Sequence, residues 1–426
     1  WTARPNAQWD GNPFNDTLVL SVTSCDSALH GRYTVGTPSS DFKNMQQVVD
    51  KLSNCSISGP VVFELAAGAY TEIVFRNAIQ GASAQNTITF TSARGRASDI
   101  MIGTTTEVAV NLRNVGHIHF KNVSIGTTQS QTSYGVKLEG DCENISFYAC
   151  NIYANASSTS NTSAAIYYSG TNNSPLYLKN ISIVKNNIQG GYYNLYLNYA
   201  GGSKNNMPAS AANRTSVTID SNYFTDAYYY GIYSSYYCYA PSISYNNIVP
   251  RSSSNTFYGI TLSNYCTVDK IVNNRLNLIN NGTTYGMNLS YLNHDATYGA
   301  NEPCLIANNE IISNNGTTVY GINRTYGRMY VINNSIYVCG TTTTRALVMG
   351  TASTATTNSF YAYNNIVIAN GTGSNNQAIY ASNANYIRRT YQVFFDYNAY
   401  YSTLDMAYAG SALPNLSDWQ STYQQD

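Results

Sequence analysis

Residues able to perform acid–base chemistry are sparse in this sequence of 426 residues. Glycoside hydrolysis requires two carboxyl groups flanking the scissile bond, and two local acidic pairs stand out, Asp220 with Asp226 and Asp295 with Glu302. Both pairs are more typical of solvated acids in loops or strands. The sequence therefore assigns no catalytic residue. Other acids are scattered: Asp141, Glu143, Asp269, Glu310 and Asp396.

Two histidines at His117 and His119 alternate along an expected strand, which directs both side chains to the same face. That spacing could hold a metal ion, but no Cys or Asp follows at ligand spacing. The sequence also lacks a Cys-x-x-Cys pair. We therefore expect a solvent-facing histidine pair, no metal site and no cofactor, with a bound Ca²⁺ left open.

Tyrosine clusters carry the stronger functional signal in a chain with 40 tyrosines. Half of the residues in a strand point outward, so stacked strands would align these side chains into a flat aromatic stripe. Such a stripe suits sugar rings or a protein partner. The alternative is an inward tyrosine stack together with surface tyrosines of high β propensity. The candidate ligand-binding residues are Tyr192, Tyr193, Tyr228, Tyr229, Tyr236 and Tyr237.

A recurring asparagine, usually doubled and followed by an apolar residue, organises the elements that would position these side chains. Successive copies lie 25 to 36 residues apart, a period typical of repeat architectures. Asparagine tolerates the left-handed backbone of a sharp turn, and its side chain can bond neighbouring backbone groups. We expect a ladder of asparagines in successive turns, assigned to within one residue: Asn122, Asn151, Asn187, Asn222, Asn247, Asn274, Asn309, Asn334, Asn365 and Asn398.

A second phrase, Tyr-Gly-apolar, falls between these anchors, as at Tyr230-Gly231-Ile232 and Tyr285-Gly286-Met287. Alternating residues follow it, which indicates short half-buried strands. No single unit can bury its apolar face, so stacked units must share one core. The pattern predicts an all-β fold: a single-stranded right-handed parallel β-helix of about ten coils, with an N-terminal capping helix and a short C-terminal helix.

Domain boundaries follow from this pattern. The expected segments are an irregular lead-in at 1–30, an N-terminal cap at 31–65, the β-helix at 66–401 and a C-terminal cap segment at 402–426. A helix over 41–54 would be capped by Ser40 or Asp41. A second helix follows Pro414, with Ser417 and Gln420 as a capping box. Three insertions should project as loops, at 155–163, 200–214 and 293–303.

Composition narrows the possible partners. The formal net charge is zero and only 10% of residues are charged. This argues against nucleic-acid binding, which requires a basic face, and against electrostatic attachment to membranes. No apolar run approaches the 18 residues of a spanning helix. We therefore expect no nucleic acid partner and no membrane insertion.

Eight cysteines suggest an oxidising compartment, because their number is even. A disulfide between Cys25 and Cys55 would cross-link the N-terminal region. Cys238 and Cys266 precede their asparagine anchors by similar distances, so stacked coils would bring them close enough for a disulfide. The alternative for each pair is two buried free thiols.

Several stretches of the chain resemble pectate-lyase-like domains of large secreted and surface proteins of the Bacteroidota. The resemblance implies a right-handed parallel β-helix and export to the cell surface. It concerns the fold more than the activity. It rests on Gly31–Gly36, Asp41-Phe42, Asn54–Phe63, Ala82–Phe90, Asn398–Tyr401 and Leu416–Gln420.

The catalytic strings of β-helix galacturonan hydrolases are not found in this sequence. There is no Asn-Thr-Asp, no Asp-Asp, no Gly-His-Gly and no Arg-x-Lys. We therefore expect a non-catalytic extracellular module of a larger surface or filament protein, acting in adhesion, glycan binding or structural assembly. Its partners would be a glycan, a neighbouring surface protein or copies of itself. The alternative is a polysaccharide lyase or glycoside hydrolase acting on an acidic polysaccharide.

Overall fold

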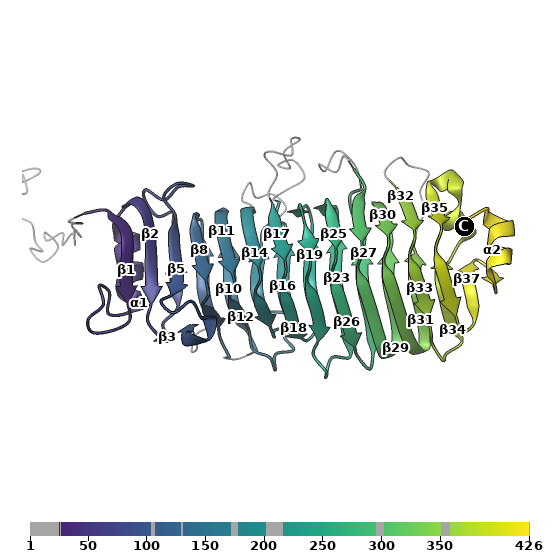
Figure 1. Ribbon diagram of the computed structural model, residues 1–426, viewed down its shortest axis with the longest axis horizontal. Coiled ribbons are helices and arrows are strands. Elements are labelled where there is room, and N and C mark those ends of the chain that lie inside the picture. The colour runs from purple at the N-terminus through teal and green to yellow at the C-terminus, as the bar shows by residue number, and fades with distance from the viewer. Residues whose placement is uncertain are drawn as a thin grey trace, which may run out of the picture.

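The protein is an elongated stack of parallel strands in a computed structural model (Figure 1). Successive coils pair in parallel from one end of the stack to the other, which is the topology of a parallel β-helix. The expected fold class is therefore correct. The structure describes residues 25, 27–103, 107–128, 131–171, 178–201, 216–294, 302–350 and 358–425.

One side of the stack is a sheet of thirteen described strands, here called the first side. Its strands alternate between inward apolar and outward residues, as in β2. In chain order they are β1 (Leu29–Val35), β2 (Ile57–Leu65), β5 (Ile88–Ser92), β8 (Ile118–Lys121), β11 (Cys142–Tyr148), β14 (Leu178–Val184), β17 (Val217–Asp220), β21 (Ile243–Ser244), β25 (Lys270–Val272), β28 (Cys304–Ala307), β30 (Arg328–Ile332), β32 (Ser359–Tyr363) and β35 (Val393–Asp396).

All but two of the remaining described strands form two further sides, joined where the long strands β29 (Glu310–Arg324) and β31 (Ser335–Met349) run through both. The second side contains their first halves with β3 (Gly68–Tyr70), β6 (Ile100–Ile102), β9 (Ser124–Gly126), β12 (Asn151–Tyr153), β15 (Asn187–Gln189), β18 (Tyr223–Ala227), β22 (Asn247–Pro250), β26 (Arg275–Ile279), β33 (Ile366–Ala369) and β36 (Ala399–Ser402).

The third side contains the second halves of β29 and β31. Its other parallel strands are β4 (Ile73–Phe75), β7 (Val108–Arg113), β10 (Ser133–Glu139), β13 (Ser163–Ser169), β16 (Tyr193–Asn198), β19 (Tyr230–Ser235), β23 (Thr256–Ser263), β27 (Thr283–Leu289), β34 (Asn375–Ala381) and β37 (Asp405–Ala409). An antiparallel strand, β38 (Ala412–Leu413), closes this side. A separate two-stranded sheet pairs β20 (Tyr239–Ala240) with β24 (Thr267–Val268).

Asparagine ladder residues occupy the turn between the first and second sides. In four of the doubled pairs the first residue is left-handed, as at Asn308 with φ 55°, and the second points into the core. Asn309 Nδ2 donates to Ile271 O at 2.8 Å and to Asn334 Oδ1 at 2.9 Å. The same bonds repeat along the stack. The ladder runs through Asn186, Asn222, Asn246, Asn274, Asn309, Asn334, Asn365 and Asn398.

Four expected ladder positions differ from this line. Asn187 and Asn247 each lie one residue past it, as the first residues of β15 and β22. Asn151 likewise begins β12, and Cys150 takes the ladder position, its backbone N–H donating to Asn186 Oδ1 at 2.9 Å. Asn122 is the left-handed turn residue, with φ 53°. A shift of one residue reverses the direction of a side chain in a strand, and sequence spacing alone does not resolve that shift.

The number of coils also exceeds the asparagine count. Strands β1, β2 and β5 form the first side before the first asparagine anchor at residue 122. The ten anchors mark the later coils, so the first side has thirteen strands instead of about ten. The segment expected to be an N-terminal cap therefore contains the first two strands of the sheet.

Both helices have asparagine caps in place of the expected ones, and α1 also begins later than expected. Helix α1 spans Met45–Asn54, and its cap is Asn44, which accepts from the Gln47 N–H. The Asp41 carboxylate instead accepts from Thr34 N and Oγ1, each at 2.8 Å. Helix α2 spans Leu416–Tyr423 and is capped by Asn415, not by a box of Ser417 and Gln420.

Helix α2 covers the C-terminal end of the stack (Figure 1). Its Trp419 is fully buried and meets the ring of Phe395 in β35 at 5.4 Å. At the N-terminal end, α1 buries Met45, Val48 and Leu52 in the common core. These contacts cover apolar surface that an open terminal coil would expose. No helix in the described part of the chain is long and apolar enough to cross a membrane.

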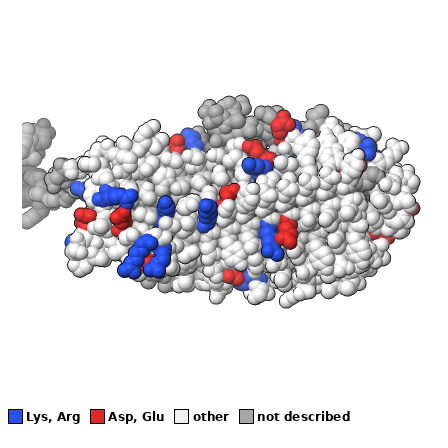
Figure 2. Space-filling view, in the orientation of Figure 1, with Lys and Arg blue, Asp and Glu red and all other residues white. Residues whose placement is uncertain are grey.

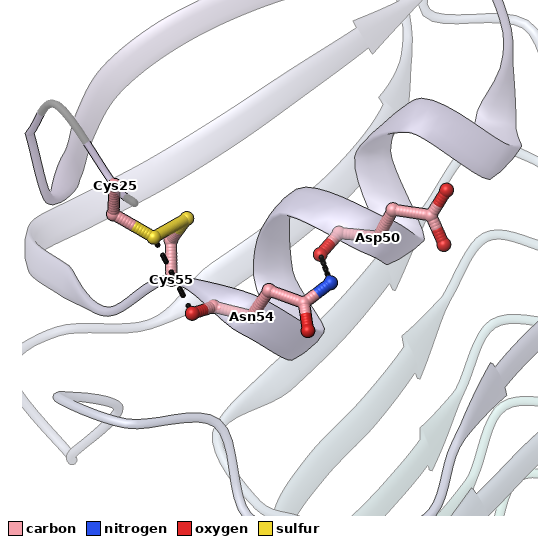
Figure 3. The surroundings of a disulfide bond; sticks show 4 residues. All are labelled: Cys25, Asp50, Asn54 and Cys55. Atoms are coloured by element: carbon pink, nitrogen blue, oxygen red, sulfur yellow. Dashed lines mark hydrogen bonds between the residues drawn. A yellow bond between two sulfur atoms is a disulfide. The ribbon is translucent and has the colours of Figure 1, made fainter. Parts of the chain in front are cut away.

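A disulfide joins Cys25 to Cys55 at the end of α1, as expected, with the Cα atoms 5.7 Å apart. Figure 3 shows Cys25 Sγ against the Asn54 carbonyl oxygen, 3.3 Å away. The second expected pair is wrong, because Cys238 and Cys266 are buried free thiols. Cys266 Sγ instead approaches Ser263 O at 3.1 Å. Of the three expected loops, 155–162 contains no strand, and the other two lie mostly outside the described residues.

Candidate functional site: the tyrosine face

Two lines of tyrosines project outward from the third side of the stack, and together we call them the tyrosine face. The long column comprises Tyr193, Tyr230, Tyr258, Tyr285 and Tyr320, which occupy one register position in five successive coils. The short column comprises Tyr167, Tyr196 and Tyr233 at the next outward position.

The Tyr-Gly-apolar phrase places the two columns side by side. In β19 the half-buried Tyr230 is followed by buried Gly231 and Ile232, and Tyr233 then points outward again. Two inward residues in succession break simple alternation. A Cβ at Gly231 would come within 2.7 Å of the Gly259 carbonyl oxygen, so the first inward position requires a small residue. The resulting bend brings the Tyr230 and Tyr233 rings to 4.9 Å.

Rings within each column stack on one another. Centroids in the long column lie 5.1, 5.0, 4.5 and 4.6 Å apart, and the interplanar angles lie between 4° and 26°. Nearly parallel rings this close must overlap in offset stacks. Each ring therefore covers part of its neighbour's face. The columns present ring edges and phenol hydroxyls outward, where the sequence suggested a flat stripe of ring faces.

Burial keeps these phenols protonated. It raises the pKa of Tyr196 to about 12, with neighbouring tyrosines adding to the shift. It likewise raises the pKa values of Tyr193, Tyr230 and Tyr258. A protonated phenol both donates and accepts a hydrogen bond. The tyrosine face is therefore a neutral array of hydroxyls at neutral pH.

Cations lie at the two ends of this face. Lys137 Nζ is 5.7 Å from the Tyr134 ring and 3.1 Å from Glu139 Oε1. Arg345 follows Tyr320 in register, and its Cζ lies 3.3 Å from the Tyr380 ring. Charged side chains are few over the view of Figure 2 as well. The intervening tyrosine columns contain no charged residue.

Four of the six expected ligand-binding tyrosines lie on or beside this face. Tyr193 belongs to the long column, and Tyr192 stacks on Tyr229 next to it, with centroids 4.9 Å apart. Tyr228 lies beneath the guanidinium of Arg251, whose Cζ is 5.5 Å from the ring. All of these residues surround the start of β16 and β19.

The other two expected tyrosines lie beyond the opposite end of the same strands. Tyr236 is 36% exposed and stacks on Tyr199 at 4.6 Å. Tyr237 is buried and stacks toward Tyr265 at 5.9 Å. They form a separate group. The clusters of adjacent tyrosines do not include Tyr258, Tyr285 and Tyr320 of the long column, which the Tyr-Gly phrase marks together with Tyr230.

The two histidines do not form the expected pair along one strand. His117 lies in a left-handed turn, with φ 62°, before β8 begins. Its Nδ1 accepts from Asn144 Nδ2 at 3.0 Å, whereas His119 Nδ1 contacts Ser146 Oγ at 2.7 Å. Burial, with His117 nearby, lowers the pKa of His119. Within the described residues no three His, Cys, Asp or Glu side chains group as metal ligands.

The expected acidic pair of Asp220 and Asp226 is divided between two sides of the coil. Asp220 ends β17 and accepts from Ser221 Oγ at 2.6 Å and from Ser244 Oγ. Asp226 lies in β18 and accepts from Gln189 Nε2 at 2.8 Å. Asp295 lies outside the described residues, so its pairing with Glu302 has no structural account.

A shallow hollow of about 240 Å³ brings other acids together. It lies where β8, β11 and β14 begin, and its lining includes Asp141, Glu143, Lys179 and His117. Two carboxyl groups, an amine and an imidazole at one place are a possible acid–base set. Sequence spacing did not select it, because these residues come from three successive coils.

Comparison with known proteins adds little to this picture. No protein-family model matches the chain, and no curated protein matches it. Among solved structures, a pectin methylesterase from Aspergillus niger matches with 15% identity and a TM-score of 0.31. The match covers 83% of this chain and 89% of that chain. A likeness this distant carries no argument about activity, and the fold assignment rests on the strand pairing.

The tyrosine face can recognise a ligand by repeated hydrogen bonds. Its two columns offer phenol hydroxyls at nearly constant spacing along the stack, bordered by ring edges. The Tyr258 ring stacks on its neighbours Tyr230 and Tyr285, so the array is already ordered. An ordered array loses less conformational entropy on binding than free side chains do.

Proposed function

We propose that the protein is a non-catalytic extracellular module that binds a neutral polysaccharide along its tyrosine face. The observation that carries the proposal is the pair of adjacent outward columns, one of five tyrosines and one of three. An extended polymer lying along the stack would meet at least one phenol at each of six successive coils, and a pair of phenols at the coils of β16 and β19. Its hydroxyl groups can donate to and accept from them.

The neutrality of the face supports this ligand class. The pectin-type acidic polymers expected for a lyase or hydrolase require cationic partners for their carboxylates. The long column offers five phenols and no cation between Lys137 and Arg345. Ring edges add apolar contact for sugar C–H groups, as aromatic residues do in many binding sites.

The covered ends of the stack support binding at the side over assembly by end-to-end stacking. Trp419 of α2 is buried against Phe395 in the last strand of the first side. A second copy would have to displace this helix to continue the sheet. Adhesion through the tyrosine face therefore fits better than filament growth through the coils.

The proposed location is the cell surface. A disulfide such as Cys25–Cys55 persists in an oxidising compartment. The resemblance to surface proteins of the Bacteroidota points in the same direction and supports export as part of a larger protein.

A glycan array tests the proposal. Wild-type protein should bind a neutral polysaccharide, and a Tyr230→Ala/Tyr258→Ala double variant should lose most of that binding. The matched control is Tyr361→Ala, which removes a ring stacked between Tyr330 and Phe394 on the first side. Equal binding by the two variants, or a blank array for the wild type, would contradict the proposal.

A second candidate function is favoured by the hollow at Asp141 and Glu143. It would be a polysaccharide lyase or glycoside hydrolase, with Lys179 and His117 beside the two acids. Incubation with polyuronates should then produce reducing ends or unsaturated products, and Glu143→Gln should abolish them. Product formation by the wild type would refute the non-catalytic proposal.

A further inference from the structure

A buried arginine with unused hydrogen-bond donors lies inside the β-helix. Arg324 ends β29, and its side chain is fully buried, as is Asn358. Arg324 Nη2 donates to Gly327 O at 3.1 Å and to Asn358 Oδ1. Among the described residues, three donor atoms beside these contacts have no hydrogen-bond partner: Nε and Nη1 of Arg324 and Nδ2 of Asn358.

The assignment of the Asn358 amide follows from its neighbours. Its Oδ1 faces two donors, Arg324 Nη2 and the Gly327 N–H. The nitrogen must therefore point the other way, and it adds one more buried donor. An unsatisfied buried donor costs about 1–3 kcal/mol.

The positive charge of Arg324 adds to the cost of burying this side chain. Burial lowers the pKa of Arg324 to about 9, so the guanidinium remains cationic at neutral pH. No described carboxylate forms an ion pair with it. The Phe360 ring, 5.6 Å from Cζ, offers its π face. An isolated buried charge is costly without a counter-charge.

A second buried arginine shows how the chain satisfies such a group by itself. Arg251 Nε donates to Asp226 O at 3.1 Å, Nη1 to Ser158 O at 3.0 Å and Nη2 to Gly191 O at 3.2 Å. Every nitrogen has a carbonyl acceptor. Arg324 has acceptors for Nη2 alone.

The missing partner must accept hydrogen bonds and carry negative charge. A water molecule would accept, but it would bring two further donors into a place already short of acceptors. A monoatomic anion brings acceptance and charge without donors. We propose that Arg324 and Asn358 hold a buried halide ion, chloride under physiological conditions. The site lies inside the stack and is independent of the tyrosine face.

Thermal unfolding in different salts tests this site. Wild-type protein should melt about 2 °C higher in sodium chloride than in sodium gluconate of equal ionic strength, and the rise should saturate. Crystals grown in sodium bromide should give an anomalous peak beside Arg324. Identical melting in both salts, together with no bromide peak, would overturn the proposal.

Three variants separate a halide site from a general salt effect. Asn358→Asp supplies an internal carboxylate, so this variant should fold and lose the chloride dependence. Arg324→Met should lose the dependence as well. Arg251→Met is the matched control, and it should keep the full dependence although its own melting temperature falls. If Arg324→Met does not fold, Asn358→Asp decides: a dependence unchanged from wild type refutes the site.

Discussion

Four of the doubled asparagines divide two tasks between their residues. The first, as at Asn308, adopts the left-handed backbone that ends a first-side strand. The second, as at Asn309, points inward and bonds the turns above and below. A serine, lysine or tyrosine replaces the first residue in some coils, at Ser221, Lys185 and Tyr245, each with positive φ. The inward position is chemically stricter, because it needs both a donor and an acceptor.

Replacing an inward ladder asparagine should therefore be costly. Asn309→Ala removes one acceptor of Asn274 Nδ2 and the side-chain donor to the Ile271 carbonyl inside the stack. We expect a loss of about 2–4 kcal/mol in the free energy of unfolding, measured by urea denaturation. Asn308→Gly is the control, and it should change stability by less than about 1 kcal/mol, because glycine adopts the left-handed conformation freely. Equal losses for the two variants would contradict this division.

At the scale of the element, the bend in the third-side strands decides where the tyrosines lie. It depends on small residues at one register position, including Gly231, Gly259, Gly286 and Gly321. Ala346 occupies the next coil at that position, and the coil before Gly231 has the buried Asn194 there. Without the bend, strict alternation would turn one of the two columns inward.

Enlarging one of these positions should disturb both stability and the face. A Cβ at Gly286 would lie 2.4 Å from the Gly321 carbonyl oxygen. Gly286→Val should thus lower the free energy of unfolding by about 2–4 kcal/mol and weaken glycan binding. Asn288→Ala, an outward change in the same strand, should cost less than about 1 kcal/mol. Unchanged unfolding and binding by Gly286→Val would show that the bend tolerates larger residues.

The N-terminal helix depends on a covalent link. The Cys25–Cys55 bond closes a loop with a sequence separation of 30 residues at the end of α1. Cross-links of this length stabilise by about 2–4 kcal/mol. A Cys25→Ser/Cys55→Ser variant should show early loss of helical signal at α1 and faster proteolysis near residue 55. Hydrogen exchange indistinguishable from the wild type in 45–54 would argue against such a role.

Across the whole molecule, tyrosines in and beside the two columns couple stability to alkaline pH. The pKa values of Tyr134, Tyr192 and Tyr196 are raised to about 12, with burial as the main cause. The unfolded chain would release these protons near pH 10, before the folded chain does. The stability from this difference is therefore full below about pH 10 and is lost as pH rises toward about 12.

Melting temperature followed between pH 8 and 12 should consequently stay level and then fall steeply above about pH 10. Phenolate absorbance should report late titration of the column tyrosines in the folded state. A Tyr193→Phe/Tyr230→Phe variant keeps the rings but removes two ionisable groups, so its melting temperature should fall less. A decline that is equal in the variant and the wild type would contradict the coupling.

The sequence by itself determined the architecture. Regular recurrence of Asn and Tyr-Gly phrases with apolar neighbours requires units that share a core, and a neutral composition separates this surface from nucleic-acid binders. The spacing of these motifs and the overall composition can both be read from the sequence without knowing which side chains meet. They predict the parallel β-helix, the helix near each end and the Cys25–Cys55 pair.

Only the tertiary structure decided which side chains meet. The inward asparagine, the free thiols of Cys238 and Cys266 and the two tyrosine columns all depend on register between coils about 25 to 36 residues apart. A shift of one residue reverses a side chain, and the bend at Gly231 reverses it again. The buried Arg324 belongs to the same class, because its missing acceptors become evident only when the surrounding coils are in place.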